Sequence, residues 1–82
     1  MSEENLDGYQ RLGKIKLIYG FYPQEFNLEG RPYQVEKITE EKRIELEGFG
    51  TVYKLRIDCI NGQFEILNPE GTNIWHARRL GL

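Results

Sequence analysis

The sequence predicts an all-β fold with little or no helix. Alanine occurs once among the 82 residues, glycine occurs nine times, and β-branched and aromatic residues recur in short alternating runs. This composition is typical of strands joined by tight turns. We expect a small antiparallel barrel or a strongly bent sheet of about five to six strands, of SH3-like or OB-like size. The radius of gyration for this length should be roughly 12 Å.

The first predicted strand covers residues 15–19, where apolar side chains alternate with lysines. Residues 24–28 and 31–35 form the next two strands, because the two residues between them include Gly30, which tolerates positive φ in a hairpin turn. A two-residue turn at this place sets Phe26 directly opposite Tyr33.

Residues 39–47 fit two interpretations. Thr39 could cap a short helix that ends at Gly48. However, the segment has Ile44 and Leu46 as its apolar residues, and they stand two positions apart, as on one face of a strand. We favour the strand.

A turn at residues 48–50 pairs that strand with residues 51–57. The expected register sets Leu46 opposite Tyr53 and Ile44 opposite Leu55.

Asn61 and Gly62 stand between two alternating runs, and this dipeptide is the preferred type I′ hairpin turn. The resulting register pairs Cys59 with Phe64. It also sets Asp58 against a second carboxylate, a like-charge pair that costs a few tenths of a kcal/mol.

The last strand covers residues 74–80, with Trp75 and Ala77 on one face. The alternation along all the strands predicts one hydrophobic core. Its expected members are Ile15, Leu17, Tyr19, Phe26, Tyr33, Val35, Ile38, Leu46, Tyr53, Leu55, Ile57, Phe64, Ile66 and Trp75.

The chain has one histidine, one cysteine and one serine, so few catalytic or metal sites can be assembled from it. A Ser-His-Asp triad, a multi-cysteine zinc site and an internal disulfide are excluded. Cys59 continues the inward-facing series of its strand, and His76 falls out of phase with Trp75 and should face solvent. We therefore predict no enzyme activity, no catalytic residues, no cofactor and no metal.

Residues 1–5 lack the features of an export signal, and no stretch is long enough to span a membrane. We expect a cytoplasmic protein with no membrane contact. Residues 1–8 should form a loose segment before a single β domain over residues 9–82.

Nucleic acid is one candidate partner, because small β-barrels bind bases on aromatic side chains within a basic groove. Residues 1–8 and 40–47 carry charges of −3 and −2, so the rest of the chain carries +3 although the whole chain carries −2. The candidate nucleic-acid face consists of Lys14, Lys16, Arg56 and Arg78. If the first and last strands are neighbours, the two lysines and Arg78 could share one surface.

Protein is the favoured partner. The apolar stretch at residues 17–22 cannot bury both of its faces in one small sheet. Ile18, Phe21 and Tyr22 form the candidate protein-contact patch, for a partner or for self-association. The sequence thus predicts a binding or adaptor module that contacts protein, with a nucleic-acid-binding small β-barrel as the alternative.

A spaced series of core and turn residues resembles short bacterial domains of unknown function that are expected to be all-β. The series covers roughly residues 21–80 and consists of Pro23, Phe26, Gly30, Tyr33, Val35, Ile38, Tyr53, Gly62, Phe64, Ile66, Trp75, Arg79 and Leu80. The resemblance implies an all-β fold. Because some of these domains are encoded beside DNA-repair polymerases, it also implies a link to DNA repair, by nucleic-acid binding or as a polymerase adaptor. It assigns no catalytic or ligand-binding residue.

Overall fold

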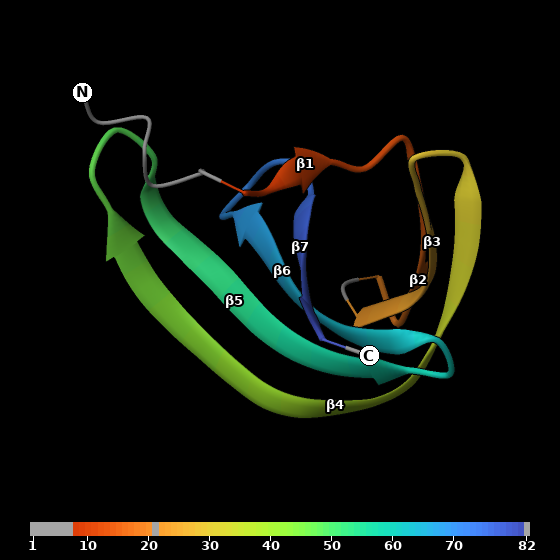
Figure 1. Cartoon of the computed structure of the whole chain (residues 1–82). Helices are drawn as coiled ribbons and strands as arrows, with labels where there is room; N and C mark the ends of the chain where they lie inside the picture. The colour runs from red at the N-terminus through yellow and green to blue at the C-terminus, as the bar shows by residue number, and fades with distance from the viewer. Residues whose placement is uncertain (1–7, 21, 82) are drawn as a thin grey trace.

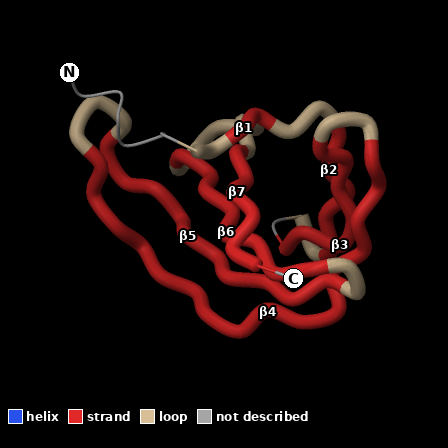
Figure 2. The backbone as a smooth tube through the Cα atoms, viewed as in Figure 1, coloured by secondary structure: helices blue, strands red, loops and turns tan. Residues whose placement is uncertain are grey.

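The computed structural model describes residues 8–20 and 22–81, so most of the expected loose segment, residues 1–8, lies outside the described residues. The described residues form seven antiparallel strands and no helix, in the sheet order β1-β7-β6-β5-β4-β3-β2. The sheet curls into a half-barrel (Figures 1 and 2). The strands are β1 (Gln10–Arg11), β2 (Lys14–Ile18), β3 (Tyr22–Leu28), β4 (Arg31–Leu46), β5 (Gly50–Cys59), β6 (Gly62–Pro69) and β7 (His76–Gly81).

The all-β prediction is confirmed, but the predicted number of five to six strands is too low. The strand that the sequence did not reveal is β1, which pairs with β7 through only two residues in the described part of the chain. Leu12 and Gly13 then carry the chain to β2, which pairs with β3 at the other end of the strand order. The two edges of the curled sheet are therefore contiguous in the sequence.

The hairpin of β3 and β4 forms in the expected register. Phe26 lies opposite Tyr33, and Glu29 and Gly30 both have positive φ, at 54° and 79°. The rings of Phe26 and Tyr33 stack with centroids 5.4 Å apart, and Phe64 packs edge-on against both. These three rings form the centre of the core.

Residues 39–46 belong to β4, so the strand interpretation of this ambiguous segment is confirmed. The segments predicted as separate strands form one strand of 16 residues, which is bent rather than broken (Figure 1). Irregularities in the register between Val35 and Lys37 and between Ile38 and Glu40 accompany the bend. They allow the first part of β4 to pair with β3 and the remainder to pair with β5.

The expected register between β4 and β5 is wrong. Leu46 pairs with Gly50 and Ile44 pairs with Val52, a shift by an odd number of positions that moves both apolar residues to the outer face. Val52, only 1% exposed, is buried there with Leu67 in a second, small apolar cluster. In this register Leu46 lies beside Val52 and Leu67, so apolar side chains on the outer face cover one another.

The hairpin of β5 and β6 is shifted by two residues from the expected register. Cys59 pairs with Gly62, so Ile60 and Asn61 form the turn, and neither has the positive φ of a type I′ turn. An even shift keeps every side chain on its expected face. It also replaces the predicted contact between two carboxylates by an Arg56–Glu65 pair, which is electrostatically favourable.

The core lies inside the curl of the sheet, and the Cα radius of gyration is 11.9 Å, close to the value expected for the length. Tyr19 was expected in the core but is 83% exposed, and Leu46 and Tyr53 are only half-buried. Leu12 and Leu28 take part instead. The described core consists of Leu12, Phe26, Leu28, Tyr33, Leu55, Ile57, Cys59, Phe64, Ile66, Trp75 and Ala77.

Candidate functional site

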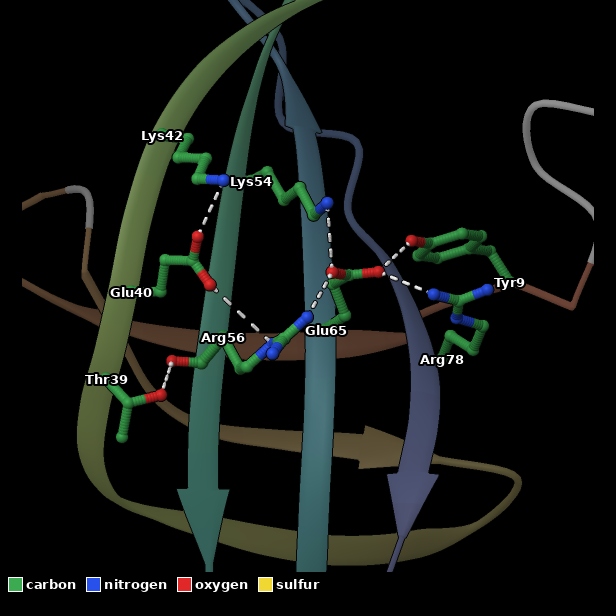
Figure 3. Close-up of polar contacts among 8 residues, drawn as sticks. All are labelled: Tyr9, Thr39, Glu40, Lys42, Lys54, Arg56, Glu65 and Arg78. Atoms are coloured by element: carbon green, nitrogen blue, oxygen red, sulfur yellow. Dashed lines mark hydrogen bonds and ion pairs between the residues drawn. The ribbon is translucent and has the colours of Figure 1, made fainter.

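A buried carboxylate organises the outer face of the sheet (Figure 3). Glu65 of β6 has a side chain that is only 1% exposed, and basic residues of the neighbouring strands surround it. Arg78 Nη2 on β7 lies 2.8 Å from Glu65 Oε1, and Lys54 Nζ on β5 lies 3.2 Å from Oε2. Arg56 Nη2 approaches Oε2 at 3.5 Å, and the Tyr9 hydroxyl donates a hydrogen bond to Oε1. We call these five residues the Glu65 cluster.

The Glu65 cluster keeps its carboxylate ionised. Burial alone raises the pKa of Glu65, but hydrogen bonds from Tyr9 and Lys54 and the charges of Lys54 and Arg78 outweigh it and lower the pKa. Burial, followed by the hydrogen bond to Glu65, raises the pKa of Tyr9 to about 12. The Glu65 carboxylate is fully paired within the protein, which is typical of a structural carboxylate and not of a general acid or base.

The four basic residues of the candidate nucleic-acid face divide into two pairs. Arg56 and Arg78 both bind Glu65 and lie together on the outer face. Lys14 and Lys16 are exposed on β2, whose neighbour in the sheet is β3. The last strand adjoins β1 and not β2, so strand pairing does not bring the lysines beside Arg78.

The candidate protein-contact patch lies at the end of β2 and the start of β3. Ile18 is 36% exposed and Tyr22 is half-buried, while Phe21 lies outside the described residues. Tyr19, which the sequence placed in the core, is 83% exposed between them and has a left-handed backbone with φ at 58°. Together with Val35 and Ile38 of β4, these side chains line a groove of about 260 Å³.

The Tyr22 hydroxyl donates a hydrogen bond of 3.3 Å to Glu41 Oε1. The charge of Glu41, followed by burial, raises the pKa of Tyr22. This contact joins the start of β3 to the middle of β4. It holds one wall of the patch, while the Tyr19 ring projects into solvent.

A second cavity, of about 340 Å³, opens on the inner side of the sheet and is lined by Glu41, Tyr53, Leu55, Asn68 and Trp75. Asn68 donates to the carbonyl oxygens of Thr72, at 3.2 Å, and of Ile74, at 2.8 Å. These bonds hold the segment that positions Trp75. Nothing in the local sequence around Asn68 shows that its amide reaches these two carbonyls, so sequence reasoning missed this contact.

Cys59 and His76 do not form a catalytic pair. They belong to β5 and β7, with β6 between them, and Cys59 is part of the core whereas His76 packs beside Val52 and Leu67 on the outer face. Burial, followed by the charge of Asp58, raises the pKa of Cys59 to about 11. Burial, followed by the charge of Arg11, lowers the pKa of His76, which is half-buried instead of facing solvent as expected.

Within residues 8–20 and 22–81, no group of three or more His, Cys, Asp or Glu side chains is arranged to hold a metal ion. None of the described segments is a helix long and apolar enough to cross a membrane. No family model, curated protein or solved structure matches the chain.

Proposed function

We propose that the chain is a non-enzymatic, cytoplasmic binding module that contacts protein through the tip of the β2–β3 hairpin. The observation that carries this proposal is the conformation of Tyr19, a residue that has a left-handed backbone and is 83% exposed. Ile18 and the groove of about 260 Å³ adjoin this residue.

Stability alone does not favour tyrosine at this position. A left-handed backbone costs a residue with a Cβ roughly 1–2 kcal/mol, and glycine or asparagine tolerates it far better. The exposed ring also recovers little apolar burial in the free chain. Tyrosine is enriched at the energetically dominant positions of protein interfaces, where such a ring becomes buried.

The Glu65 cluster supports protein in preference to nucleic acid as the partner. Two of the four basic residues of the candidate nucleic-acid face, Arg56 and Arg78, already bind a buried carboxylate. Phosphate would have to compete with Glu65 for them. The chain as a whole is acidic, with a net charge of −2, which opposes binding to a polyanion.

Site-specific photo-crosslinking tests this function. A photoreactive phenylalanine analogue replaces Tyr19 in the full chain, produced in living bacterial cells. The matched control carries it in place of Ile60, which is 72% exposed in the β5–β6 turn. We expect a discrete protein adduct from position 19 that is absent from position 60.

Equal labelling at both positions would overturn the proposal. The nucleic-acid alternative would replace it if an oligonucleotide bound at about 150 mM salt and binding weakened steeply as salt rose. In that case the double variant Lys14→Ala and Lys16→Ala would lose the oligonucleotide.

A further inference from the structure

The free edge of β2 is a regular template for one more strand. In the described part of the chain, β2 pairs with β3 and with no other strand. The irregularity in this pair lies on β3, because Lys16 pairs with Glu25 and Leu17 with Pro23, which leaves Gln24 as the extra residue. All five residues of β2 therefore stay in register, and their outward N–H and C=O groups can pair with an added chain.

Space for such a chain exists beside β2. A groove of about 600 Å³ is lined by residues 13–17, by residues 25–27 of β3, and by Asn73 and Trp75 ahead of β7. Ile15 and Leu17, which are half-buried, contribute apolar surface to it, and the buried rings of Phe26 and Trp75 lie beneath. An edge strand that merely avoids aggregation has no need of a neighbouring groove with apolar lining.

The side chains of β2 define which sequence would fit. Lys14 and Lys16 are exposed on one face, while Ile15 and Leu17 are half-buried on the other. In an antiparallel pair, each side chain lies directly beside the residue opposite it on the same face. Carboxylates are therefore favoured opposite the lysines, and apolar side chains opposite Ile15 and Leu17. Glu25 balances part of the lysine charge but leaves the groove net positive.

We infer that β2 binds, by β-strand addition, an extended segment of a partner protein in which acidic and apolar residues alternate. This inference rests on the proposed protein-binding function and deepens it, because Tyr19 directly follows β2. A second copy of the chain is a poorer occupant. Antiparallel pairing of two β2 edges would bring Lys14 and Lys16 of each copy close together.

The test uses a fluorescent synthetic peptide that alternates glutamate and valine, with binding to the full chain measured by fluorescence anisotropy. The site variant combines Lys14→Glu with Lys16→Gln, the milder change because Lys16 lies opposite Glu25. The matched control combines Arg31→Glu with Lys42→Gln, which changes the charge equally at exposed positions of β4. We expect the site variant to weaken binding about tenfold or more and the control to leave it unchanged.

Two further measurements distinguish strand addition from simple charge attraction. The bound peptide should slow hydrogen exchange at the outward amides of β2. A peptide with N-methyl groups on the amides that face β2 should lose binding although its charge is the same.

Several results would overturn the inference: equal binding of a lysine-valine peptide, equal binding of the N-methylated peptide, or preferential binding of an oligonucleotide. Self-association through β2, seen as concentration-dependent sedimentation that the site variant alters, would also overturn it. A specific crosslink at Tyr19 together with no binding of the acidic peptide would refute strand addition and leave the proposed function standing.

Discussion

Replacing Glu65 by glutamine should destabilise the fold markedly. The substitution keeps the size of the side chain but removes the charge that Lys54, Arg56 and Arg78 share. It also leaves Tyr9 opposite an amide in place of a carboxylate.

The magnitude depends on how well water can replace the lost partner. Removing one partner of a fully buried pair costs about 3–5 kcal/mol. In the Glu65 cluster the carboxylate is 1% exposed, but the side chains of Lys54, Arg56 and Arg78 are 29%, 46% and 43% exposed and can be solvated again. We therefore expect a loss of about 2–3 kcal/mol in the free energy of unfolding. For a domain of this size, that lowers the melting temperature by roughly 10–20 °C.

Thermal unfolding at neutral pH, followed by circular dichroism, measures this loss. The matched control is Glu40→Gln, since Glu40 lies at the border of the same surface, bound to Lys42 and much more exposed than Glu65. The control should melt close to the wild-type protein. A Glu65→Gln variant that melted within about 3 °C of wild type would refute our account of the cluster.

The direction of the pH dependence follows from the lowered pKa of Glu65. The folded state releases this proton more readily than the unfolded state, so the stabilisation is present above the unfolded pKa of about 4.3. It is lost as pH falls through the folded pKa. The difference in melting temperature between wild type and Glu65→Gln should therefore be constant near neutrality and shrink in acid. A difference that grew in acid would contradict the lowered pKa.

Three further substitutions give distinct expectations. Trp75 is 6% exposed, so Trp75→Ala should lower the free energy of unfolding by roughly 3–5 kcal/mol and unfold most of the population. A loss of dispersion in the amide NMR spectrum would show this unfolding, and a folded variant would contradict the core assignment. Tyr19→Asn should raise the melting temperature or leave it unchanged, because asparagine tolerates positive φ, and a clear loss of stability would refute the argument from strain. Gly62→Ala should lower the free energy of unfolding by about 1 kcal/mol or more, because the new Cβ would lie 2.9 Å from the Gly81 carbonyl oxygen. In the control Gly13→Ala the new Cβ meets nothing within 4 Å, so this variant should not be destabilised. Equal melting temperatures of the two variants would contradict the clash.

The elements that depended on local chemistry were predicted well. Glu29 and Gly30 form a two-residue turn with positive φ, and Phe26 and Tyr33 face each other as the turn requires. The alternation of apolar residues along its own strand was enough to predict that Cys59 lies in the core. Turn geometry and a period of two residues act over a few bonds, so a short window of sequence contains them.

The registers of the two later hairpins were wrong because distant residues determine them. Leu46 pairs with Gly50, and this places it on the outer face beside Val52 and beside Leu67, which belongs to another strand. Glu65 pairs with Arg56 and also contacts a strand that follows later in the chain. A short stretch of sequence does not reveal these contacts with other strands.

For the two candidate binding surfaces, too, the sequence predicted what depends on local alternation and missed what depends on distant contacts. The sequence identified Lys14, Lys16 and Ile18 as exposed residues, because they sit on the outward phase of an alternating strand. It could not show that Arg56 and Arg78 meet at a buried carboxylate, nor that Tyr19 leaves the core at a left-handed turn.

The sequence by itself therefore determined the all-β class, the turn at Gly30 and the face on which most side chains of the strands lie. These features follow from backbone preferences and from the alternation of apolar and polar residues, and both depend only on residues close together in the sequence. Only the tertiary structure decided the bend of β4, the pairing of β1 with β7, the Glu65 cluster and the groove beside β2. Each of these depends on contacts between residues far apart in the chain, and these contacts form only when the sheet curls.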